Sequence, residues 1–480
     1  MILLSVALTV LKTVGLAALG YFLILAYFHV RAMMRLRFYE QQGAVVMPGA
    51  RRFFFGNSLD FREYAKARAG PEVVRGPQAW LIFEYYPRLM GLTAQGKQFR
   101  ASEYPIVAMN FQSVPDIWVS DPEIAQDVFV GKNALTDKSI DSFLMFKDVI
   151  GNSFIFGLND ETWKNKRKAM SHAFYRDRLQ HMLETLKTVL LETFASWMEK
   201  VEKSGHHDIN MATEFSDILA SNIIHICFGE DISNEMFSIK VKDKKTGAWT
   251  ARQISVKDSI YVIVGQVTDK HLKCVAHPIN WLYPHTHKLL TVDSDAQIIQ
   301  ENCKSGRAWV KSYVVDRRAG KRQSSVADNN DILSLMLSRP DVFTDEFITD
   351  EMLGFFGAAT ETTHNVFQTI LTHLMKDKAS LGRVRSEFDD RVLQALQQKD
   401  PELGKAPVTE QLAKGVTVDS CFDLDYLNNV ICEGLRFQSP GGITPVVFDR
   451  DVTLGNKLTV KKGDHVRIIH WALHKNPNEW

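Results

Sequence analysis

Two side chains of opposite charge lie three positions apart in a largely apolar stretch near the end of the chain. Glu433 and Arg436 belong to the segment LDYLNNVICEGLRFQSP, residues 424–440. Residues three apart are neighbours on a helix, so the spacing predicts an ion pair on a helix that ends near Gln438–Pro440. On a solvated face such a pair contributes about 0.2–0.5 kcal/mol. Removing one partner of a buried pair costs roughly 3–5 kcal/mol, so its surroundings decide its importance.

The position of Glu433 on this helix favours burial. Tyr426, Val430 and Phe437 share its helical stripe, and most of the neighbouring positions are apolar. We therefore expect the Glu433–Arg436 pair to face the interior of the protein. An ordinary surface ion pair is the alternative that this helix alone leaves open.

Polar residues also interrupt a second apolar segment, MLGFFGAATETTHNVFQTILTHLM, residues 352–375. Small residues in mid-helix, Ala358 and Ala359 among them, form a flat place where a bulky group can approach the backbone. Thr362 projects a hydroxyl there, and Glu361 is beside it. An acid next to a hydroxyl is what proton delivery to a bound oxygen species requires. A Thr362 hydroxyl that only bonds back to the Ala358 carbonyl is the competing interpretation, and this helix does not decide between them.

A third candidate pair lies upstream in FGLNDETWKNKRKAMSHAF, residues 156–174. Asn159 or Asp160 is expected to cap a helix on which Trp163 and Arg167 lie one turn apart on one face. An indole N–H and a guanidinium together suit a carboxylate or another oxyanion. Because lysines surround the pair, a solvated basic face is the alternative.

The composition describes a globular chain without a nucleic-acid partner. The 480 residues are 45% hydrophobic and 24% charged, with a net charge of +1. We find no Gly-x-Gly-x-x-Gly, no phosphate-binding loop, no Gly-x-Ser-x-Gly and no His-Glu-x-x-His. The cysteines have no paired spacing, which favours free thiols in a reducing compartment over disulfides or a Cys-x-x-Cys zinc site. They are Cys227, Cys274, Cys303, Cys421 and Cys432.

The first thirty residues differ from everything that follows. Residues 13–30 carry no charged residue, and only Lys12 interrupts the apolar run before them. A bilayer span needs about 20 apolar residues, so we predict a single-pass transmembrane anchor over residues 1–30. A cleaved signal peptide typically has a basic start and a small-residue cleavage site, and neither is evident here. The positive-inside rule places the following domain in the cytosol, because the run is followed by Arg31, Arg35 and Arg37.

The remainder reads as a short linker and one large domain. Gly and Pro residues punctuate residues 31–57, which we interpret as an irregular Pro/Gly linker. Residues 58–480 show mostly helical periodicity, with a small hairpin or an insertion expected within 237–255 and a polar surface loop over 317–330. Short alternating strands follow Asp451. The predicted fold class is therefore mainly α with small β-sheets, preceded by one transmembrane helix.

Together and in this order, the three candidate sites resemble the cytochrome P-450 family of haem-thiolate monooxygenases. The resemblance covers most of the chain. It implies that Trp163 and Arg167 contact the haem propionates. The family also carries a Gly/Ala-Gly-x-Asp/Glu-Thr-Thr stretch over the haem, which the residues from Ala358 to Thr363 match. The cytochrome P-450 fold is the fold that this resemblance implies for residues 58–480.

The resemblance assigns the remaining roles and the partners. Thr362 and Glu361 would assist protonation during oxygen activation, with Ala358 and Ala359 forming the wall beside the haem. The Glu433–Arg436 pair would be a buried scaffold for the haem-binding core. The implied cofactor is haem b, with NADPH-derived electrons delivered by a flavoprotein reductase. The implied substrate is a hydrophobic small molecule, and the implied location is the membrane of the endoplasmic reticulum, with the main domain facing the cytosol.

The chain also departs from the family pattern. Family members usually have Gly where this chain has Ala359, and they continue past the position of Trp480 into a loop whose Cys ligates iron. None of the five cysteines has the Gly-rich loop surroundings that such a thiolate needs. We therefore expect an incomplete domain that lacks the axial Cys, with no metal ligand of its own. Two alternatives stay open: a haem-free truncated relative that acts as a membrane-tethered non-enzymatic or interaction protein, and an unrelated helical membrane-tethered binding protein.

Overall fold

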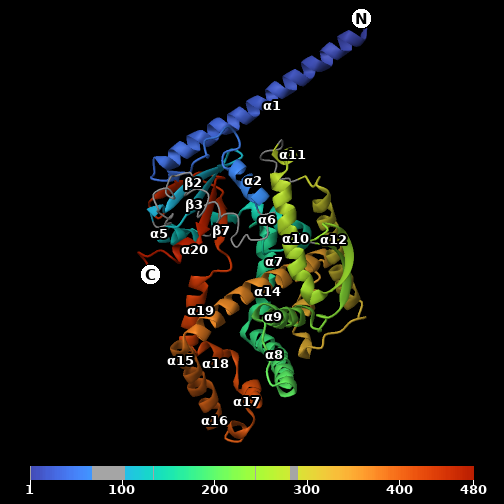
Figure 1. The fold of residues 1–480 in the computed structure, drawn as a ribbon, viewed down its shortest axis with the longest axis vertical. Helices are drawn as coiled ribbons and strands as arrows, with labels where there is room; N and C mark the ends of the chain where they lie inside the picture. The colour runs from blue at the N-terminus through green and yellow to red at the C-terminus, as the bar shows by residue number, and fades with distance from the viewer. Residues whose placement is uncertain (1, 68–102, 133–134, 244, 282–289) are drawn as a thin grey trace. The chain divides into compact units, whose positions relative to one another are not determined.

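A computed structural model describes residues 2–67, 103–132, 135–243, 245–281 and 290–480 of the chain. The fold is mainly helical with small sheets, as the sequence predicted (Figure 1). The chain divides into two compact units that are described separately below. Unit 1 comprises Met1–Ile140, Leu272–Leu290 and Ile443–Trp480, and unit 2 comprises Asp141–His271 and Thr291–Gly442.

Unit 1 is built around a six-stranded mixed sheet. Its buried strands are rich in β-branched residues and are joined in part by tight turns, as in the β2–β3 hairpin, where Gln112 and Ser113 both have positive φ. Strand β10 runs parallel to β3 and antiparallel to β7, and Arg467 on β10 bonds to Asp116 on β3. The strand order is β1 (Val45–Val46), β2 (Ile106–Phe111), β3 (Val114–Val119), β10 (His465–Ile469), β7 (Ile443–Phe448) and β4 (Thr136–Lys138).

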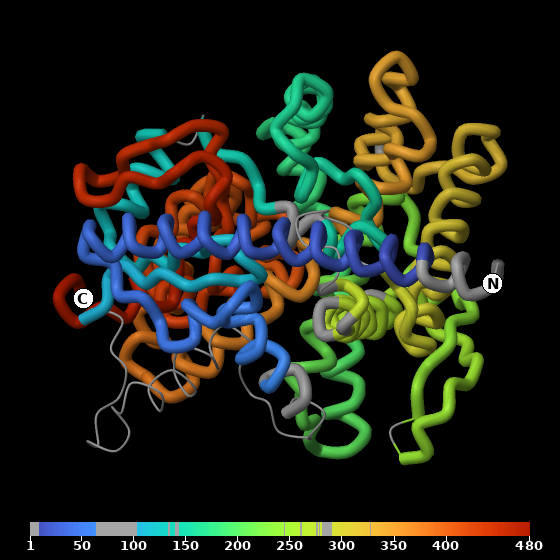
Figure 2. The backbone as a smooth tube through the Cα atoms, turned by 90° about the horizontal axis from the view of Figure 1, so that it is seen from above, coloured from blue at the N-terminus to red at the C-terminus, as the bar shows by residue number. Residues whose placement is uncertain are grey.

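The N-terminal helix α1 (Ile2–Glu40) runs unbroken from the apolar segment into the core of unit 1 (Figure 2). Ala32, Leu36 and Tyr39 are fully buried against the sheet, and the Tyr39 hydroxyl donates a hydrogen bond to Asp464 Oδ2 at 2.5 Å. The apolar part from Thr9 onward is long enough to cross a membrane, by length and composition alone. The transmembrane anchor over residues 1–30 stays a prediction.

The expected linker over residues 31–57 is wrong. Its first ten residues continue α1, and Val45–Val46 form strand β1, which pairs parallel with β2. Met47, Ala50 and Phe54 are buried as well. The three glycines and the single proline of this stretch lie in or beside turns between packed segments, so their presence did not signal a solvated connection.

Unit 2 is a helical assembly around one long central helix, α14 (Asp345–Lys376), which packs against α9, α12 and α19. The predicted hairpin is confirmed as β5 (Met236–Lys242) and β6 (Trp249–Ser255), with the turn near Gly247. The other helices of this unit that matter below are α6 (Ile140–Ile150), α7 (Glu161–Met170), α9 (Met211–Phe228), α12 (Ser294–Arg318), α13 (Ile332–Leu337), α15 (Lys378–Phe388) and α19 (Asp425–Phe437).

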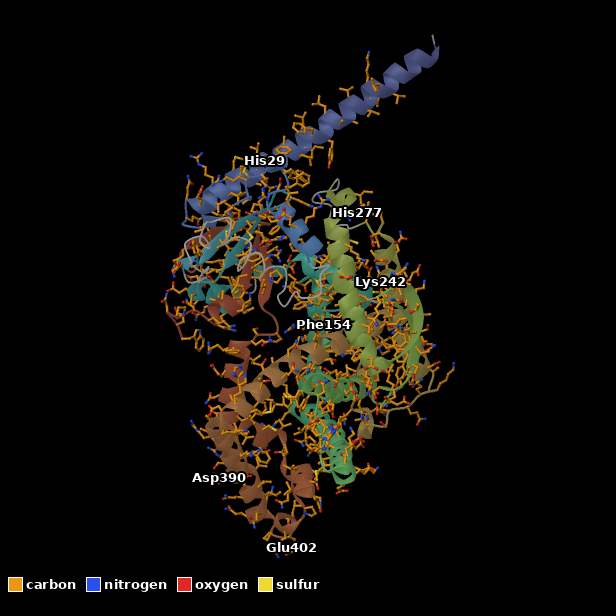
Figure 3. All side chains as sticks on the ribbon, viewed as in Figure 1. His29, Phe154, Lys242, His277, Asp390 and Glu402 are labelled. Carbon is orange, nitrogen blue, oxygen red and sulfur yellow. The ribbon has the colours of Figure 1, made fainter. Side chains whose placement is uncertain are left out.

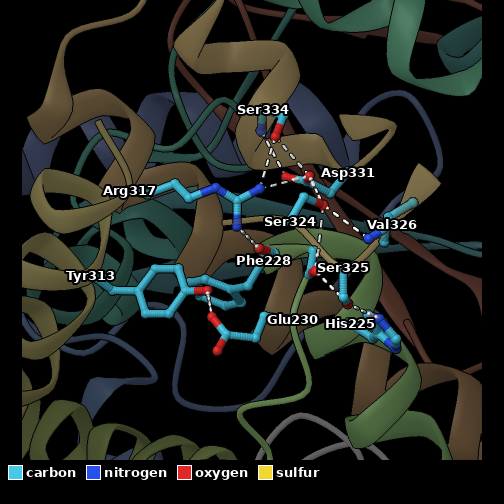
Figure 4. A network of polar contacts seen from close by, with 11 residues as sticks. His225, Phe228, Glu230, Tyr313, Arg317, Ser324, Ser325, Val326, Asp331 and Ser334 are labelled. Carbon is cyan, nitrogen blue, oxygen red and sulfur yellow. Dashed lines mark hydrogen bonds and ion pairs between the residues drawn. The ribbon is translucent and has the colours of Figure 1, made fainter. Parts of the chain in front are cut away.

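A buried polar network joins α9, α12 and α13 (Figure 4). Asp331 caps α13 by accepting from the Ser334 amide at 2.7 Å, and it receives Nη2 of Arg317 at 3.0 Å. The side chains of Arg317 and Asp331 are 5% and 0% exposed. The polar surface loop expected over 317–330 is therefore wrong at its first residue, because Arg317 is the last buried residue of α12.

Candidate functional site

Helix α14 has a buried stretch followed by a part that carries both exposed and buried residues. The residues predicted to deliver protons to bound oxygen lie in this second part. Thr344 caps the helix by accepting from the Phe347 amide at 3.2 Å, and residues 347–354 are buried. Ala358, Glu361 and Thr362 are exposed, as are Thr363 and Phe367 further along the helix. The Thr362 hydroxyl donates to the Ala358 carbonyl at 2.6 Å, so the backward bond that the sequence left open is present. Ala359, the position where the family usually has Gly, is half-buried.

The Trp163–Arg167 pair forms on α7 as predicted, but its two halves face different partners. Asp160 caps the helix by accepting from the Trp163 amide at 2.7 Å. The Trp163 indole N–H donates to the Phe154 carbonyl at 2.7 Å, so it is already engaged within the chain. Arg167 is exposed, and its guanidinium lies 5.3 Å from the Trp163 ring. The indole N–H is thus engaged within the chain, while Arg167 presents an exposed cation; the contact of both residues with the haem propionates stays a prediction.

Two buried carboxylates on α14 hold the segment that carries Phe154, which Figure 3 labels. Glu351 accepts from the Phe154 amide at 2.7 Å and from the Ser153 hydroxyl at 2.9 Å. Asp350 accepts from the Asn152 amide at 2.8 Å. Burial raises the pKa of both carboxyl groups, to about 8 for Glu351. Neither carboxylate was among the predicted site residues.

The Glu433–Arg436 pair exists, but it is not hidden from solvent. Arg436 donates to both carboxylate oxygens of Glu433, at 2.7 and 2.6 Å, in a bidentate pair on α19. The side chain of Glu433 is 61% exposed and that of Arg436 is 21% exposed. Hydrogen bonding to Arg436 lowers the pKa of Glu433. The expectation of a buried pair is wrong for Glu433, because its apolar stripe neighbours, including the 43%-exposed Phe437, are not enclosed either.

Helix α19 is held on α14 and α15 by contacts that lie away from the ion pair. Gly434 lies so close to Ile370 of α14 that an added Cβ would collide with Ile370 Cγ1. Glu387 of α15 accepts from the Tyr426 and Leu427 amides at 2.7 and 2.9 Å, which caps the start of α19. A groove of about 520 Å³ lies between these helices, and Glu433, Gly434 and Arg436 are among its lining residues.

The model of one protein family matches most of the chain. Residues 74–480 match the model described as Cytochrome P450. This match covers the helices that carry all three candidate pairs. The chain belongs to the cytochrome P450 family. The family predicted from the sequence is confirmed, and with it a haem monooxygenase as the general class of this P450.

Curated relatives of this P450 are similar at low identity. Cytochrome P450 81F1 of Arabidopsis thaliana is 21% identical over 78% of this chain and 69% of its own length. Geranylhydroquinone 3''-hydroxylase of Arnebia euchroma is 24% identical, again over 78% of this chain and 69% of its own length. A bifunctional cytochrome P450/NADPH–P450 reductase of Alternaria alternata is 23% identical over 79% of this chain and 31% of its own length.

The described residues fit the surroundings of a haem but not its iron ligand. The exposed stripe of α14 and the Arg167 cation are suitable for a flat, anionic porphyrin. A thiolate ligand must be deprotonated, and burial raises the pKa of Cys227 and that of Cys303, the latter to about 12. Partial burial also raises the pKa of Cys421. Within the described part of the chain, no group of three or more His, Cys, Asp or Glu side chains could hold a metal ion.

Proposed function

We propose that this P450 is a haem-dependent monooxygenase that inserts one atom of O₂ into a hydrophobic small molecule. The observation that carries the proposal is the exposed stripe of Ala358, Glu361 and Thr362 on a helix whose preceding turns are buried. Glu361 and Thr362 would hold and pass protons, and Ala358 and Ala359 would form the wall beside the cofactor. Haem b would supply the oxygen chemistry when bound.

To pass a proton, the Thr362 hydroxyl has to give up its present hydrogen bond. Its proton is donated to the Ala358 carbonyl at 2.6 Å, so that bond must open before the hydroxyl can donate elsewhere. Glu361 is exposed next to it on the same helix and is the nearest acid in the sequence. Arg167 would meet a propionate of the cofactor as a single cation. Glu433 and Arg436 would support the start of the segment after α19, as a proposed scaffold pair.

We also propose that an NADPH-dependent flavoprotein reductase supplies the electrons. A relative whose name joins a cytochrome P450 to an NADPH–P450 reductase supports this choice of partner. The apolar part of α1, followed by Arg31 and Arg37, supports a membrane anchor. Attachment to the membrane of the endoplasmic reticulum, with the main domain over residues 58–480 facing the cytosol, is the orientation we propose.

The experiment compares proton delivery in matched threonine variants. Because no cysteine of the sequence has the Gly-rich surroundings of an iron ligand, the chain is assayed by itself and also joined to the C-terminal thiolate loop of a P450 relative. With reductase and NADPH, Thr362→Ala is expected to keep its haem content and to release more peroxide per NADPH consumed. Thr360→Ala is the control, since Thr360 makes the same backward bond to Phe356, at 2.8 Å, on the buried face of α14.

Three outcomes would count against the proposed function. Unchanged coupling in Thr362→Ala would contradict the proton-delivery role. Equal uncoupling in Thr360→Ala would attribute the effect to the helix and not to the exposed hydroxyl. Failure of the joined protein to take up haem would favour the haem-free interaction protein.

A further inference from the structure

The most deeply buried acid of α14 lies outside the exposed stripe of Ala358, Glu361 and Thr362. Glu351 is 0% exposed, and both of its oxygens are used by the segment between α6 and α7. One oxygen accepts from the Phe154 amide and the other contacts the Ser153 hydroxyl. A buried carboxyl group is costly for a protein, so its retention requires a compensating role in the local structure.

The bonds made by Glu351 continue to α7. Phe154 uses its amide for Glu351 and its carbonyl for the Trp163 indole, so a single residue links the two helices. Gly354 leaves room for this arrangement, because an added Cβ would lie 2.5 Å from Ser153 Oγ. The Phe154 ring also contacts the Phe355 ring, edge to face, at 5.6 Å between centroids.

We propose that Glu351 is a positioning residue for the α7 face: it fixes Ser153 and Phe154, and through them the Trp163 indole and the Arg167 cation one turn beyond. The relevance of this face to a haem rests on the proposed function. The positioning itself concerns only the protein chain, so it can be tested without cofactor.

The charged groups around Glu351 come from three helices. Asp350 on α14 raises its pKa, and Lys166 on α7 lowers it. Arg307 on α12 binds the neighbouring Asp350 and Glu346, and it donates to the Val149 carbonyl at 2.9 Å. Burial is the largest influence and places the pKa of Glu351 at about 8.

Protonation changes the direction of one bond and the strength of another. When Glu351 is ionised, Ser153 donates its hydroxyl proton to the carboxylate and Phe154 makes a charge-assisted bond. When Glu351 is neutral, its own O–H donates to Ser153 Oγ, and the bond from the Phe154 amide is weaker. The Trp163 indole is therefore expected to respond to pH through Phe154, with a midpoint near the pKa of Glu351.

The test follows the Trp163 indole N–H by nuclear magnetic resonance in the full chain, in nanodiscs, with ¹⁵N-labelled tryptophan and no haem. The chain has nine tryptophans, and the Trp163 signal is assigned by its loss in Trp163→Phe. We expect this signal to move with pH in the wild-type chain and to be pH-independent in Glu351→Gln, which keeps an acceptor for the Phe154 amide. In Glu351→Ala, exchange of the indole proton should be about tenfold faster, which corresponds to about 1.4 kcal/mol.

Two further variants test the link from Ser153 to Trp163 even if Glu351→Ala does not fold. Gly354→Ala places a methyl group against Ser153 Oγ and should move the Trp163 signal while Glu351 is intact. Glu346→Gln changes an exposed acid on the same helix, which pairs with Arg307 and Lys311, and should leave the signal unchanged. A Trp163 signal that keeps its wild-type pH dependence in Glu351→Gln would overturn the proposal. An unchanged signal in folded Gly354→Ala would also overturn it.

Discussion

Two arginine–carboxylate pairs in unit 2 have opposite surroundings. Arg317 and Asp331 are 5% and 0% exposed, whereas Arg436 and Glu433 are 21% and 61% exposed. The sequence suggested the reverse, because Arg317 begins a stretch that was expected to be a polar surface loop, whereas Glu433 lies in an apolar helix. The comparison shows that the apolar character of a helix does not bury an ion pair unless other elements cover it.

The difference follows from the number of partners around each carboxylate. Asp331 receives Arg317, the Ser324 and Ser334 hydroxyls and the Ser334 amide, and Arg317 also donates to the Phe228 carbonyl. Gly229, with a φ of +71°, allows this close packing, since a Cβ there would lie 2.5 Å from Asp331 Oδ2. Both carboxylate oxygens of Glu433 receive Arg436, on the same helix.

The largest expected effect comes from breaking the buried pair. Asp331→Ala strands a buried guanidinium and should lower the free energy of unfolding by about 3–5 kcal/mol. Urea denaturation followed by circular dichroism measures this change. The exposed Arg339–Asp341 pair is the matched control, and Asp341→Ala should leave the urea midpoint unchanged. Equal midpoints for the two variants would remove the distinction between the pairs.

Glu351 is a buried acid that makes no ion pair with an arginine among the described residues, so its contribution to stability should depend on pH. The pKa of Glu351 is raised from 4.5 to about 8, so the folded chain holds a proton in this window that the unfolded chain releases. The Glu351 contribution to stability therefore falls as pH rises from 4.5 toward 8, by at most about 1.4 kcal/mol per pH unit. Glu351→Gln should remove this slope in denaturation curves recorded between pH 5 and 8. A slope identical to that of the wild-type chain would show that Glu351 does not titrate there.

The packing of α19, and not its ion pair, should control how firmly it is held. Gly434→Ala inserts a methyl group against Ile370 and should cost about 1–3 kcal/mol in thermal or urea unfolding. Gly382→Ala on α15 is the matched control, because a Cβ there meets no atom within 4 Å. Greater helix propensity should make that variant more stable by about 0.5–1 kcal/mol. Stabilisation in both variants would mean that α19 is not closely packed on α14.

The smallest expected effect comes from the exposed pair. Glu433→Ala should lower the free energy of unfolding of the chain by about 0–1 kcal/mol. Because Arg436 lowers the pKa of Glu433, this small contribution is present at neutral pH and is lost as pH falls below the ordinary carboxyl range. A loss as large as that of Asp331→Ala would show that Glu433 is enclosed under the conditions measured, and it would restore the expectation of a buried pair.

The local elements of the site were predictable from neighbouring residues. Asp160 begins α7 and the Thr246–Gly247 turn closes the hairpin, as expected. Helix α19 ends at Phe437, which agrees with the end predicted near Gln438–Pro440. Each of these features depends on hydrogen bonds and dihedral preferences within a few residues. The order of the three candidate pairs along the chain was sufficient to predict the family.

The acid that fixes the Trp163 segment had no comparable signal. Glu351 lies in the second turn of α14, after two first-turn acids that complement the helix dipole, so a further acid there did not stand out in the sequence. Its bond to Phe154 spans 197 positions of the sequence. Likewise, the Glu387 carboxylate that caps α19 lies 39 positions before Tyr426.

The sequence by itself determined the Asp160 cap of α7, the hairpin turn near Gly247, the end of α19 and the membership of the chain in the cytochrome P450 family, because these depend on short-range spacing and residue type. Only the tertiary structure decided which charges are buried. Arg317 and Asp331 are enclosed by three helices, while Glu433 remains open to solvent on a helix of similar apolarity. Burial is the sum of contacts from distant segments, and the energy of a charge depends on that sum and not on its immediate neighbours.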